Sequence, residues 1–194
     1  MPLDPSKRQS HIIRVSSVSD GDTFRIQSTH ELREMMGLSV MEDYISVRFF
    51  GIDAPEREQP YGEKAREVVR EALLDYPTVA VVPYDVDQYG RLVAEVILSD
   101  SRDGECTNHC LNHYLVAHGL AVNYRRFLRA AGMYGLYGPL ESSAKRERLN
   151  FWSQPYGQIV MPHEYRRRKR MRRSEQIGTG SGSGAPWRYG RRGF

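Results

Sequence analysis

The sequence predicts an α+β fold that is mainly β: a small closed barrel of five strands with about three flanking helices. Five short segments rich in β-branched residues are separated by turns that contain Gly, Asp or Pro. A strongly periodic helical segment interrupts them after the third. With 194 residues, the chain is long enough for one well-filled domain and a tail, and too short for two ordinary domains.

The predicted strands follow one another along the first hundred residues. They are residues His11–Val18, Thr23–Gln27, Tyr44–Ile52, Thr78–Pro83 and Arg91–Ser99. The polar segment 28–43 has no clear period, so we expect a loop insertion that holds no more than one helical turn. Five strands interrupted by one helix match a barrel of the OB type, which commonly binds oligonucleotides on one face.

Three segments predict helices. Tyr61–Leu74 carries apolar residues at three- and four-residue spacing. Thr107–His118 is followed by a glycine in the usual C-terminal position, and Leu140–Trp152 is entered from a proline. Between these last two helices we expect a loop rich in Tyr, Gly and Arg, residues 123–138.

Composition divides the chain into an N-terminal extension (1–10), an OB-type domain (11–162) and a basic, Gly/Ser-rich tail (163–194) that we expect to be flexible. The net charge is +4, and the tail alone contributes ten Lys/Arg against two acidic residues. Such a tail attracts a polyanion. Its run Arg166–Arg173 fits a solvated basic segment, a nucleic-acid contact or, in a eukaryote, a nuclear address.

The chain shows no apolar stretch of membrane-spanning length and no signal-peptide core at its start. Its two cysteines cannot form a disulfide framework. We therefore expect a soluble intracellular protein without a membrane partner.

Three short motifs carry charged residues suited to phosphodiester chemistry: residues 20–23, 47–56 and 87–91. Asp22 and Asp53 follow predicted strands, and they offer oxygen ligands to one hard cation, Ca²⁺ or Mg²⁺. Glu56 is placed to accept a proton from a water or to orient it. Arg48 and Arg91 keep their charge and suit contacts to phosphate oxygens.

Each motif alone has an ordinary structural explanation. Asp-Gly-Asp-Thr is most often a hairpin turn, and Asp-Ala-Pro-Glu an acidic approach to a helix. Their joint presence, in this order on this strand pattern, favours the functional interpretation.

At these residues the chain resembles the staphylococcal nuclease (thermonuclease) family, from Val15 to about Ser153. The matching segments are Asp20-Gly21-Asp22-Thr23, Val47-Arg48, Gly51-Ile52-Asp53-Ala54-Pro55-Glu56, Tyr61-Gly62, Tyr89-Gly90-Arg91, Leu115 to Ala121, and Leu149-Asn150-Phe151-Trp152. The resemblance implies an OB-fold barrel and Ca²⁺-dependent cleavage of DNA and RNA.

The same resemblance implies residue roles. Asp22 and Asp53 look like the metal carboxylates, with the backbone carbonyl of Ala54 as a further ligand. Glu56 looks like the residue that activates or orients the water, and Arg48 and Arg91 look like the pair that stabilises the charged phosphate. Tyr89 resembles a nucleotide-pocket tyrosine, and Tyr124 resembles a second one. Two departures are Ala54, where a threonine is often found, and Gln88, where a lysine can help to bind a terminal phosphate.

Cysteine and histidine side chains also cluster in the sequence, at Cys106, His109, Cys110 and His113. Their spacing does not match the ligand pairs of structural zinc sites. We expect Cys110 to pack in the core and the histidines to face solvent.

DNA or RNA is the expected partner. Tyr124, Tyr134 and Tyr137 are interleaved with arginines, so they either stack on bases or belong to an ordinary surface loop. The main functional hypothesis is a metal-dependent nuclease with little sequence preference. The alternative is a non-catalytic nucleic-acid-binding or scaffold module of the same fold.

Overall fold

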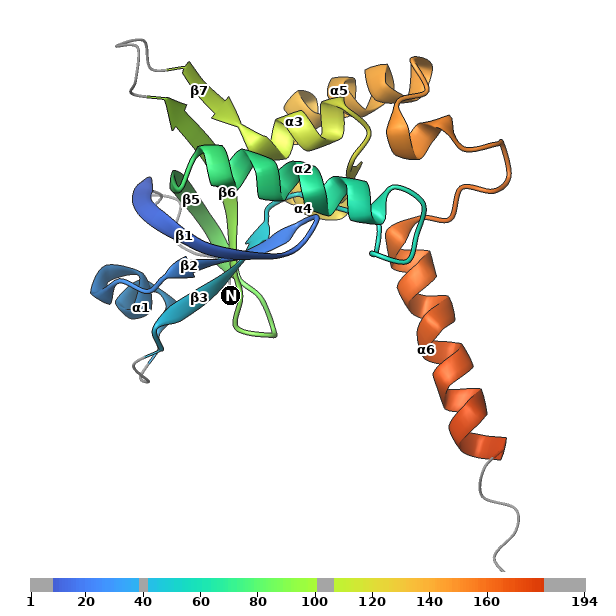
Figure 1. The fold of residues 1–194 in the computed structure, drawn as a ribbon, viewed down its shortest axis with the longest axis horizontal. Helices are drawn as coiled ribbons and strands as arrows, with labels where there is room; N and C mark the ends of the chain where they lie inside the picture. Colours follow the sequence, from blue (N-terminus) through green and yellow to red (C-terminus); the bar gives the residue numbers. More distant parts are fainter. Residues whose placement is uncertain (1–8, 39–41, 101–106, 180–194) are drawn as a thin grey trace, which may run out of the picture.

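Five strands close a β-barrel in the computed structural model, which describes residues 9–38, 42–100 and 107–179. They are β1 (His11–Asp20), β2 (Thr23–Gln27), β3 (Tyr44–Phe49), β5 (Thr78–Val86) and β6 (Leu92–Asp100). The strand order is β3-β2-β1-β5-β6, and a parallel pairing of β3 with β6 closes the barrel (Figure 1). The predicted five-stranded barrel is confirmed.

The register of the strands brings distant motifs to one end of the barrel. The β1–β2 hairpin turns between Asp20 and Thr23, and Thr23 lies opposite Arg48 of β3. A short strand, β4 (Ile52–Asp53), follows β3 and pairs with β8 (Val122–Asn123), which places Asp53 opposite Val122. The barrel therefore holds the two acidic motifs next to each other.

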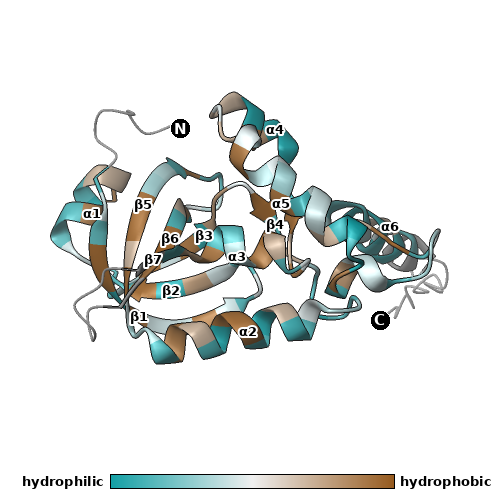
Figure 2. Cartoon of the chain, turned by 90° about the horizontal axis from the view of Figure 1, so that it is seen from above, coloured by the Kyte–Doolittle hydropathy of each residue, from teal (hydrophilic) through white to brown (hydrophobic). Residues whose placement is uncertain are grey.

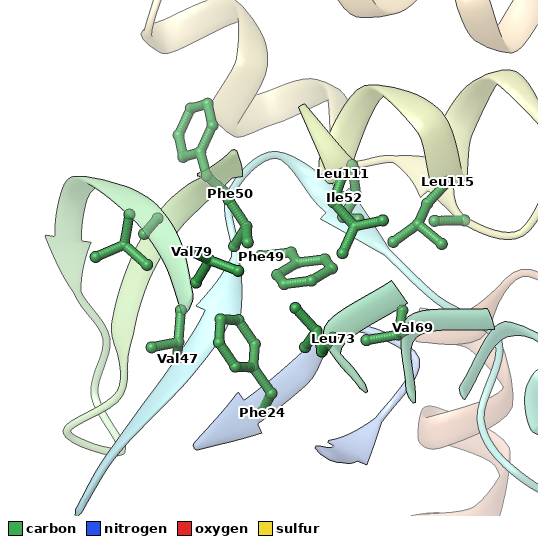
Figure 3. Close-up of a cluster of buried hydrophobic side chains, with 14 of the residues drawn as sticks. Phe24, Val47, Phe49, Phe50, Ile52, Val69, Leu73, Val79, Leu111 and Leu115 are labelled. Atoms are coloured by element: carbon green, nitrogen blue, oxygen red, sulfur yellow. The ribbon is translucent and has the colours of Figure 1, made fainter. Parts of the chain in front are cut away.

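Aromatic and branched side chains fill the barrel. Phe24 and Phe49 meet edge to face, with ring centroids 5.4 Å apart, and both are almost fully buried. Helix α2 (Gly62–Asp75) adds Val69 and Leu73 to this core (Figure 3). Alternate residues of each strand point inward, so the polar residues between them line the outside of the barrel. The helix predicted at Tyr61–Leu74 is confirmed.

The insertion 28–43 contains helix α1 (His30–Met36), which has about two turns instead of the single turn that we expected. The hydroxyl oxygen of Thr29 accepts a hydrogen bond from the backbone N–H of Leu32 and caps the helix. Leu32 is fully buried and docks α1 on the barrel. Met35 and Met36 also pack on the core, but three apolar residues in a helix of seven leave too weak a period to detect in the sequence.

The prediction of a helix at Thr107–His118 is wrong for its first turn. Residues Thr107–Cys110 form strand β7, and helix α3 spans Leu111–Ala117. Cys110 lies opposite Ile97, because β7 extends the sheet beyond β6. Backbone pairing with a neighbouring strand overrides a local helical preference here.

The loop expected between residues 123 and 138 is also wrong, since it contains helix α4 (Arg125–Ala130) and the start of helix α5 (Tyr134–Arg146). Pro139 lies inside α5 instead of preceding it. Burial of Tyr137 and Ala144 on one face of α5 outweighs the cost of the proline. The remaining part of the helix predicted to end at Trp152 is a 3-10 turn, η2 (Asn150–Ser153).

Helix α6 (Pro162–Thr179) forms the first part of the tail that we expected to be flexible. It projects away from the barrel (Figure 1), and its residues are mostly hydrophilic (Figure 2). The domain limits at residues 10 and 162 stay predictions, and residues 1–8 and 180–194 lie outside the described part of the chain. Among the described residues, no helix is long and apolar enough to cross a membrane.

Candidate active site

The β1–β2 turn and the segment after β3 lie against each other. A Cβ atom on Gly21 would come within 3.0 Å of the Cβ atoms of Ala54 and Ala65. The missing side chain thus lets the turn approach the loop that follows Asp53 and the start of α2. In this contact the backbone N–H of Ala54 donates a hydrogen bond to Asp22 Oδ2 over 3.2 Å.

Arg48 joins the two predicted metal carboxylates. Its Nη1 lies 3.1 Å from Asp22 Oδ2, and its Nη2 lies 2.9 Å from Asp53 Oδ1. Asp22 and Asp53 are only 6% and 3% exposed. Burial opposes the charge on Arg48, but the two aspartates outweigh it and raise the pKa of Arg48 above its ordinary value. These three predicted site residues therefore form one buried ionic group.

Glu56 lies beside this group at the surface of a tight loop. Its backbone N–H donates to Gln59 Oε1 (2.9 Å), and its carbonyl accepts from the N–H of Gln59 (2.8 Å). A Cβ atom on Gly62 would lie 1.9 Å from the carbonyl oxygen of Glu56. Only glycine at position 62 leaves room for this loop, which holds the half-buried carboxylate of Glu56 towards Asp53.

A third arginine enters the site from α6, and the sequence did not indicate it. Arg166 Nη2 lies 2.8 Å from Asp53 Oδ2, and Arg166 Nη1 lies 2.7 Å from Glu56 Oε1. The two carboxylates raise the pKa of Arg166, although burial works against its charge. In the sequence, Arg166 is one member of a basic run, and no local pattern separates it from its neighbours.

Asp20 is a second site residue to which the sequence assigned no role. Its Oδ1 atom is buried and has no hydrogen-bond partner among the described residues. Burial, followed by the nearby charges of Asp22 and Glu56, raises the pKa of Asp20. Asp20, Asp22, Asp53 and Glu56 supply four carboxylates against the two guanidinium groups of Arg48 and Arg166.

The residues fit a divalent cation on two grounds. An oxygen-rich carboxylate set is the donor chemistry that Ca²⁺ and Mg²⁺ prefer. The four carboxylates and two guanidinium groups leave two uncompensated negative charges, and one of the buried carboxylate oxygens, that of Asp20, lacks a donor. A dication would balance the charge and satisfy that oxygen.

Arg91 lies on the neighbouring strand edge and is held by Asp87. Its Nε and Nη2 lie 2.8 and 2.7 Å from Asp87 Oδ2. Leu92 pairs with Val47 in the parallel β3–β6 register, so Arg91 lies at the level of Ser46. Because side chains alternate along a strand, Arg91 is on the outer side of the barrel, like Arg48. Among the described contacts, Arg91 forms its ion pair with Asp87 and none with Asp22, Asp53 or Glu56.

The two predicted nucleotide-pocket tyrosines are both exposed. Tyr89 is 74% exposed, and the guanidinium of Arg91 lies 5.4 Å from its ring centroid. Tyr124 follows β8, and its backbone N–H donates to Gly51 O. Tyr124 and Asp53 both line an open hollow of about 400 Å³, to which Arg125 and Arg126 also contribute. By contrast, Tyr137 is fully buried, so it does not belong to a base-stacking loop.

The chain matches the family model described as staphylococcal nuclease homologue over residues 46–154. It belongs to the staphylococcal nuclease family. A probable endonuclease of Schizosaccharomyces pombe is 31% identical over 79% of this chain and 73% of that protein. A probable endonuclease LCL3 of Yarrowia lipolytica is 31% identical over 79% and 74% of the two chains. A micrococcal nuclease of Shigella flexneri is 32% identical over 79% of each.

The staphylococcal nuclease match covers only part of the site. Residues 46–154 include Arg48, Asp53, Glu56 and Arg91. The hairpin that carries Asp22 and the helix that carries Arg166 lie outside it. Their place in the site rests on the contacts described above.

The structure confirms only part of what we expected for the cysteine and histidine cluster. Cys106 lies outside the described residues, His109 is exposed, and His113 is half-buried instead of facing solvent. Cys110, His113 and Glu95 place one ligand atom each within 4.8 Å of one another.

Hydrogen bonds satisfy the carboxylate of Glu95 in this group, whereas His113 Nε2 is buried without a hydrogen-bond partner among the described residues. Glu95 accepts hydrogen bonds from the hydroxyl groups of Tyr84 (3.0 Å) and Tyr137 (2.7 Å), one at each carboxylate oxygen. Burial raises the pKa of the Cys110 thiol to about 11, which disfavours the thiolate that a metal would need.

Proposed function

We propose that the chain is a Ca²⁺-dependent endonuclease that hydrolyses phosphodiester bonds of DNA and RNA with little sequence preference. The observation that carries the proposal is the single ionic group in which Arg48 joins Asp22 to Asp53, with Glu56 beside it. The endonuclease and micrococcal nuclease names of its relatives support the same activity.

Phosphodiester hydrolysis requires charge stabilisation and a positioned water more than covalent chemistry. In the proposed reaction, the oxygen of water forms a bond to phosphorus while the ester oxygen leaves. Glu56 accepts the proton of that water, or orients it, from its position at the rim of the ionic group. Arg48 and Arg91 bind the phosphate oxygens, where negative charge grows in the transition state.

Asp22, Asp53 and the backbone carbonyl of Ala54 would hold the cation, with Asp20 as a further carboxylate at its edge. The bound cation would polarise the phosphate and offset its charge. Mg²⁺ or another divalent cation would suit the same oxygen donors. Tyr89 and Tyr124 would stack against nucleotides on either side, since stacking on aromatic rings tolerates any base.

A cleavage assay with two active-site variants tests this function. Supercoiled plasmid and a single-stranded oligonucleotide are incubated with the protein and Ca²⁺, Mg²⁺ or a chelator. We expect chelator-sensitive cleavage, with kcat lower by about 100- to 10,000-fold in Glu56→Gln and about 100- to 1,000-fold in Arg91→Ala.

The matched controls are Glu67→Gln and Arg70→Ala, which alter a partly exposed ion pair on the outer side of α2. They should cleave like the unaltered protein. Binding of the oligonucleotide without any chelator-sensitive product would instead support the non-catalytic alternative. Cleavage that neither active-site variant affects would exclude the proposed residue roles.

A further inference from the structure

Arg166 occupies carboxylate oxygens that the proposed cation and water would need. It donates to Asp53 Oδ2 over 2.8 Å and to Glu56 Oε1 over 2.7 Å. Arg48 holds the other oxygen of Asp53, so both oxygens of this aspartate face a guanidinium group. The side chain of Arg166 is 32% exposed, which is low for an arginine in a helix that projects into solvent.

The start of α6 is attached to the rest of the protein mainly through the loop that carries Glu56. Gln59 Nε2 donates to Val160 O over 2.8 Å, just before the helix. One turn after Arg166, Lys169 Nζ lies 2.7 Å from Glu58 Oε1. Beyond these contacts, α6 runs away from the barrel (Figure 1), and its residues 170–175 are exposed.

Just before α6, Ile159 and Met161 pack against a small apolar cluster that includes Trp152. The contacts of α6 itself are mostly polar and local. Pro162 is the one buried residue within 162–175, the part of α6 whose burial is described. The contacts described above are hydrogen bonds and ion pairs at or near the surface.

The Lys169–Glu58 ion pair is largely exposed and therefore contributes little to stability. The start of α6 can leave Asp53 and Glu56 without opening the core of the barrel, because residues 163–175 contribute no side chain to that core.

A cation at Asp22 and Asp53 would lie next to the guanidinium of Arg166. Like charges repel strongly at such short distances in a partly buried site. Asp53 Oδ2 cannot serve both as a ligand of the cation and as the close partner of Arg166 without this repulsion. Binding of one therefore disfavours binding of the other, and the effect is reciprocal.

We propose that Arg166 is an intramolecular competitor of the divalent cation, which holds α6 on Asp53 and Glu56 in the cation-free protein and is displaced with the start of α6 when the cation binds. This proposal rests on the proposed cation-dependent function. Helix α6 lies outside residues 46–154, which the family model matches. Under this proposal, α6 directly controls access of the cation to Asp53.

Calcium titration by isothermal calorimetry, without nucleic acid, tests the competition. The full chain is compared with Arg166→Ala, Arg166→Lys and the control Arg167→Ala, which removes an exposed charge from the next position of the same helix. We expect Arg166→Ala to bind Ca²⁺ about tenfold more tightly than the unaltered protein, a difference of about 1.4 kcal/mol. Arg166→Lys should fall between them, because a lysine cannot donate to both carboxylates in the same geometry. Arg167→Ala should bind Ca²⁺ about as tightly as the unaltered protein. This control measures the effect of losing one positive charge from α6 without losing the contacts of Arg166.

Amide hydrogen exchange of residues 163–170 gives a second readout. In the unaltered protein, Ca²⁺ should speed exchange in this segment, because a helix released from its contacts is only marginally stable. In Arg166→Ala the exchange should be fast with or without Ca²⁺. Far-ultraviolet circular dichroism and the melting temperature establish that each variant is folded.

Each outcome decides the proposal. Equal or weaker Ca²⁺ binding by Arg166→Ala overturns the competition while leaving the proposed function intact. Slower cleavage at saturating Ca²⁺, with unchanged Ca²⁺ affinity, would make Arg166 a substrate contact and also overturn it. If none of these proteins binds Ca²⁺, Mg²⁺ or Mn²⁺, the cation-dependent function fails and the competition fails with it.

Discussion

Glu141 of α5 is a buried carboxylate that fixes the strand beside Asp53. Its Oε1 accepts a hydrogen bond from the backbone N–H of Asn123 (2.9 Å), and Asn123 belongs to β8, the partner of β4. Lys145 and Arg125 lie 2.8 and 3.2 Å from its Oε2. Burial favours the neutral form of Glu141, but Lys145 and the Asn123 N–H outweigh it and lower its pKa. The charged form of Glu141 therefore stabilises the fold.

This residue predicts a pH effect on stability. A carboxylate whose pKa is lower in the folded state stabilises the protein above its unfolded pKa, and this stability is lost as pH falls through the folded pKa. We expect Glu141→Gln to lower the free energy of unfolding by about 2 kcal/mol at pH 7. The difference from the unaltered protein should shrink as pH falls below 4.5, the ordinary value for glutamate. Urea denaturation between pH 7 and pH 3 measures it, and a difference independent of pH would contradict this role.

At the scale of elements, the loop between β4 and α2 positions Glu56. Its conformation depends on Gly62, where a Cβ atom would lie 1.9 Å from the Glu56 carbonyl oxygen. Backbone cannot yield as a flexible side chain can, so a larger residue must displace the loop. The loop lies outside the five strands of the barrel, so we expect a change in the loop to affect activity more than folding.

Gly62→Ala tests the loop directly. We expect the variant to fold but to cleave nucleic acid at least about 100-fold more slowly, because a misplacement of about 1 Å at the site has this cost. The control is Gly135→Ala in α5, where a Cβ atom meets no heavy atom within 4 Å. Gly135→Ala should keep its activity and gain up to about 1 kcal/mol of stability. Equal activity of the two variants would show that the loop does not fix Glu56.

Local patterns predicted the elements whose own sequence has a strong helical or strand period, and missed those whose conformation depends on contacts with other elements. Strand β2 has the bounds that the sequence indicates, and α2 differs by about one residue at each end. Strand β7 was predicted as helix, because its four residues carry no strand period of their own and form a strand by pairing with β6. Helix α5 was predicted to begin after Pro139, since a proline usually stops a helix and the sequence does not show the burial of Tyr137.

The same division holds for the site. Motif spacing indicated Asp22, Arg48, Asp53 and Glu56, and the structure brings these four together. Arg166 was missed because 110 residues separate it from Glu56, and only the path of α6 brings the two into contact. The sequence indicated that the tail is basic, but it did not indicate that one of its arginines reaches Asp53 and Glu56.

At the scale of the whole molecule, positive charge gathers on α6 next to the site. Arg168, Lys169, Arg172 and Arg173 line an open hollow of about 460 Å³ that Glu58 borders on the loop side. Nucleic acid bound in the active site would pass close to this basic face. We therefore expect α6 to contribute phosphate contacts that carry no sequence preference.

Salt dependence measures these contacts. Binding of a labelled duplex is followed by fluorescence anisotropy across salt concentrations, with chelator present to prevent cleavage. The double substitution Arg172→Gln and Arg173→Gln should weaken binding and reduce the slope of log K against log salt by about one unit for each arginine. The matched control Arg25→Gln removes an exposed arginine of β2. An unchanged slope in the double variant would exclude α6 from the binding surface.

The most direct test of the central claim is the calcium dependence of cleavage of circular single-stranded DNA, which has no ends and so reports endonuclease action alone. The protein should open the circles with a rate that saturates as free Ca²⁺ rises and falls to background in chelator. Asp53→Asn removes one charge from the buried pair that Arg48 joins, so it should need at least about tenfold more Ca²⁺ for the same rate. Opening of the circles in chelator, or the same calcium dependence in Asp53→Asn, would contradict the account.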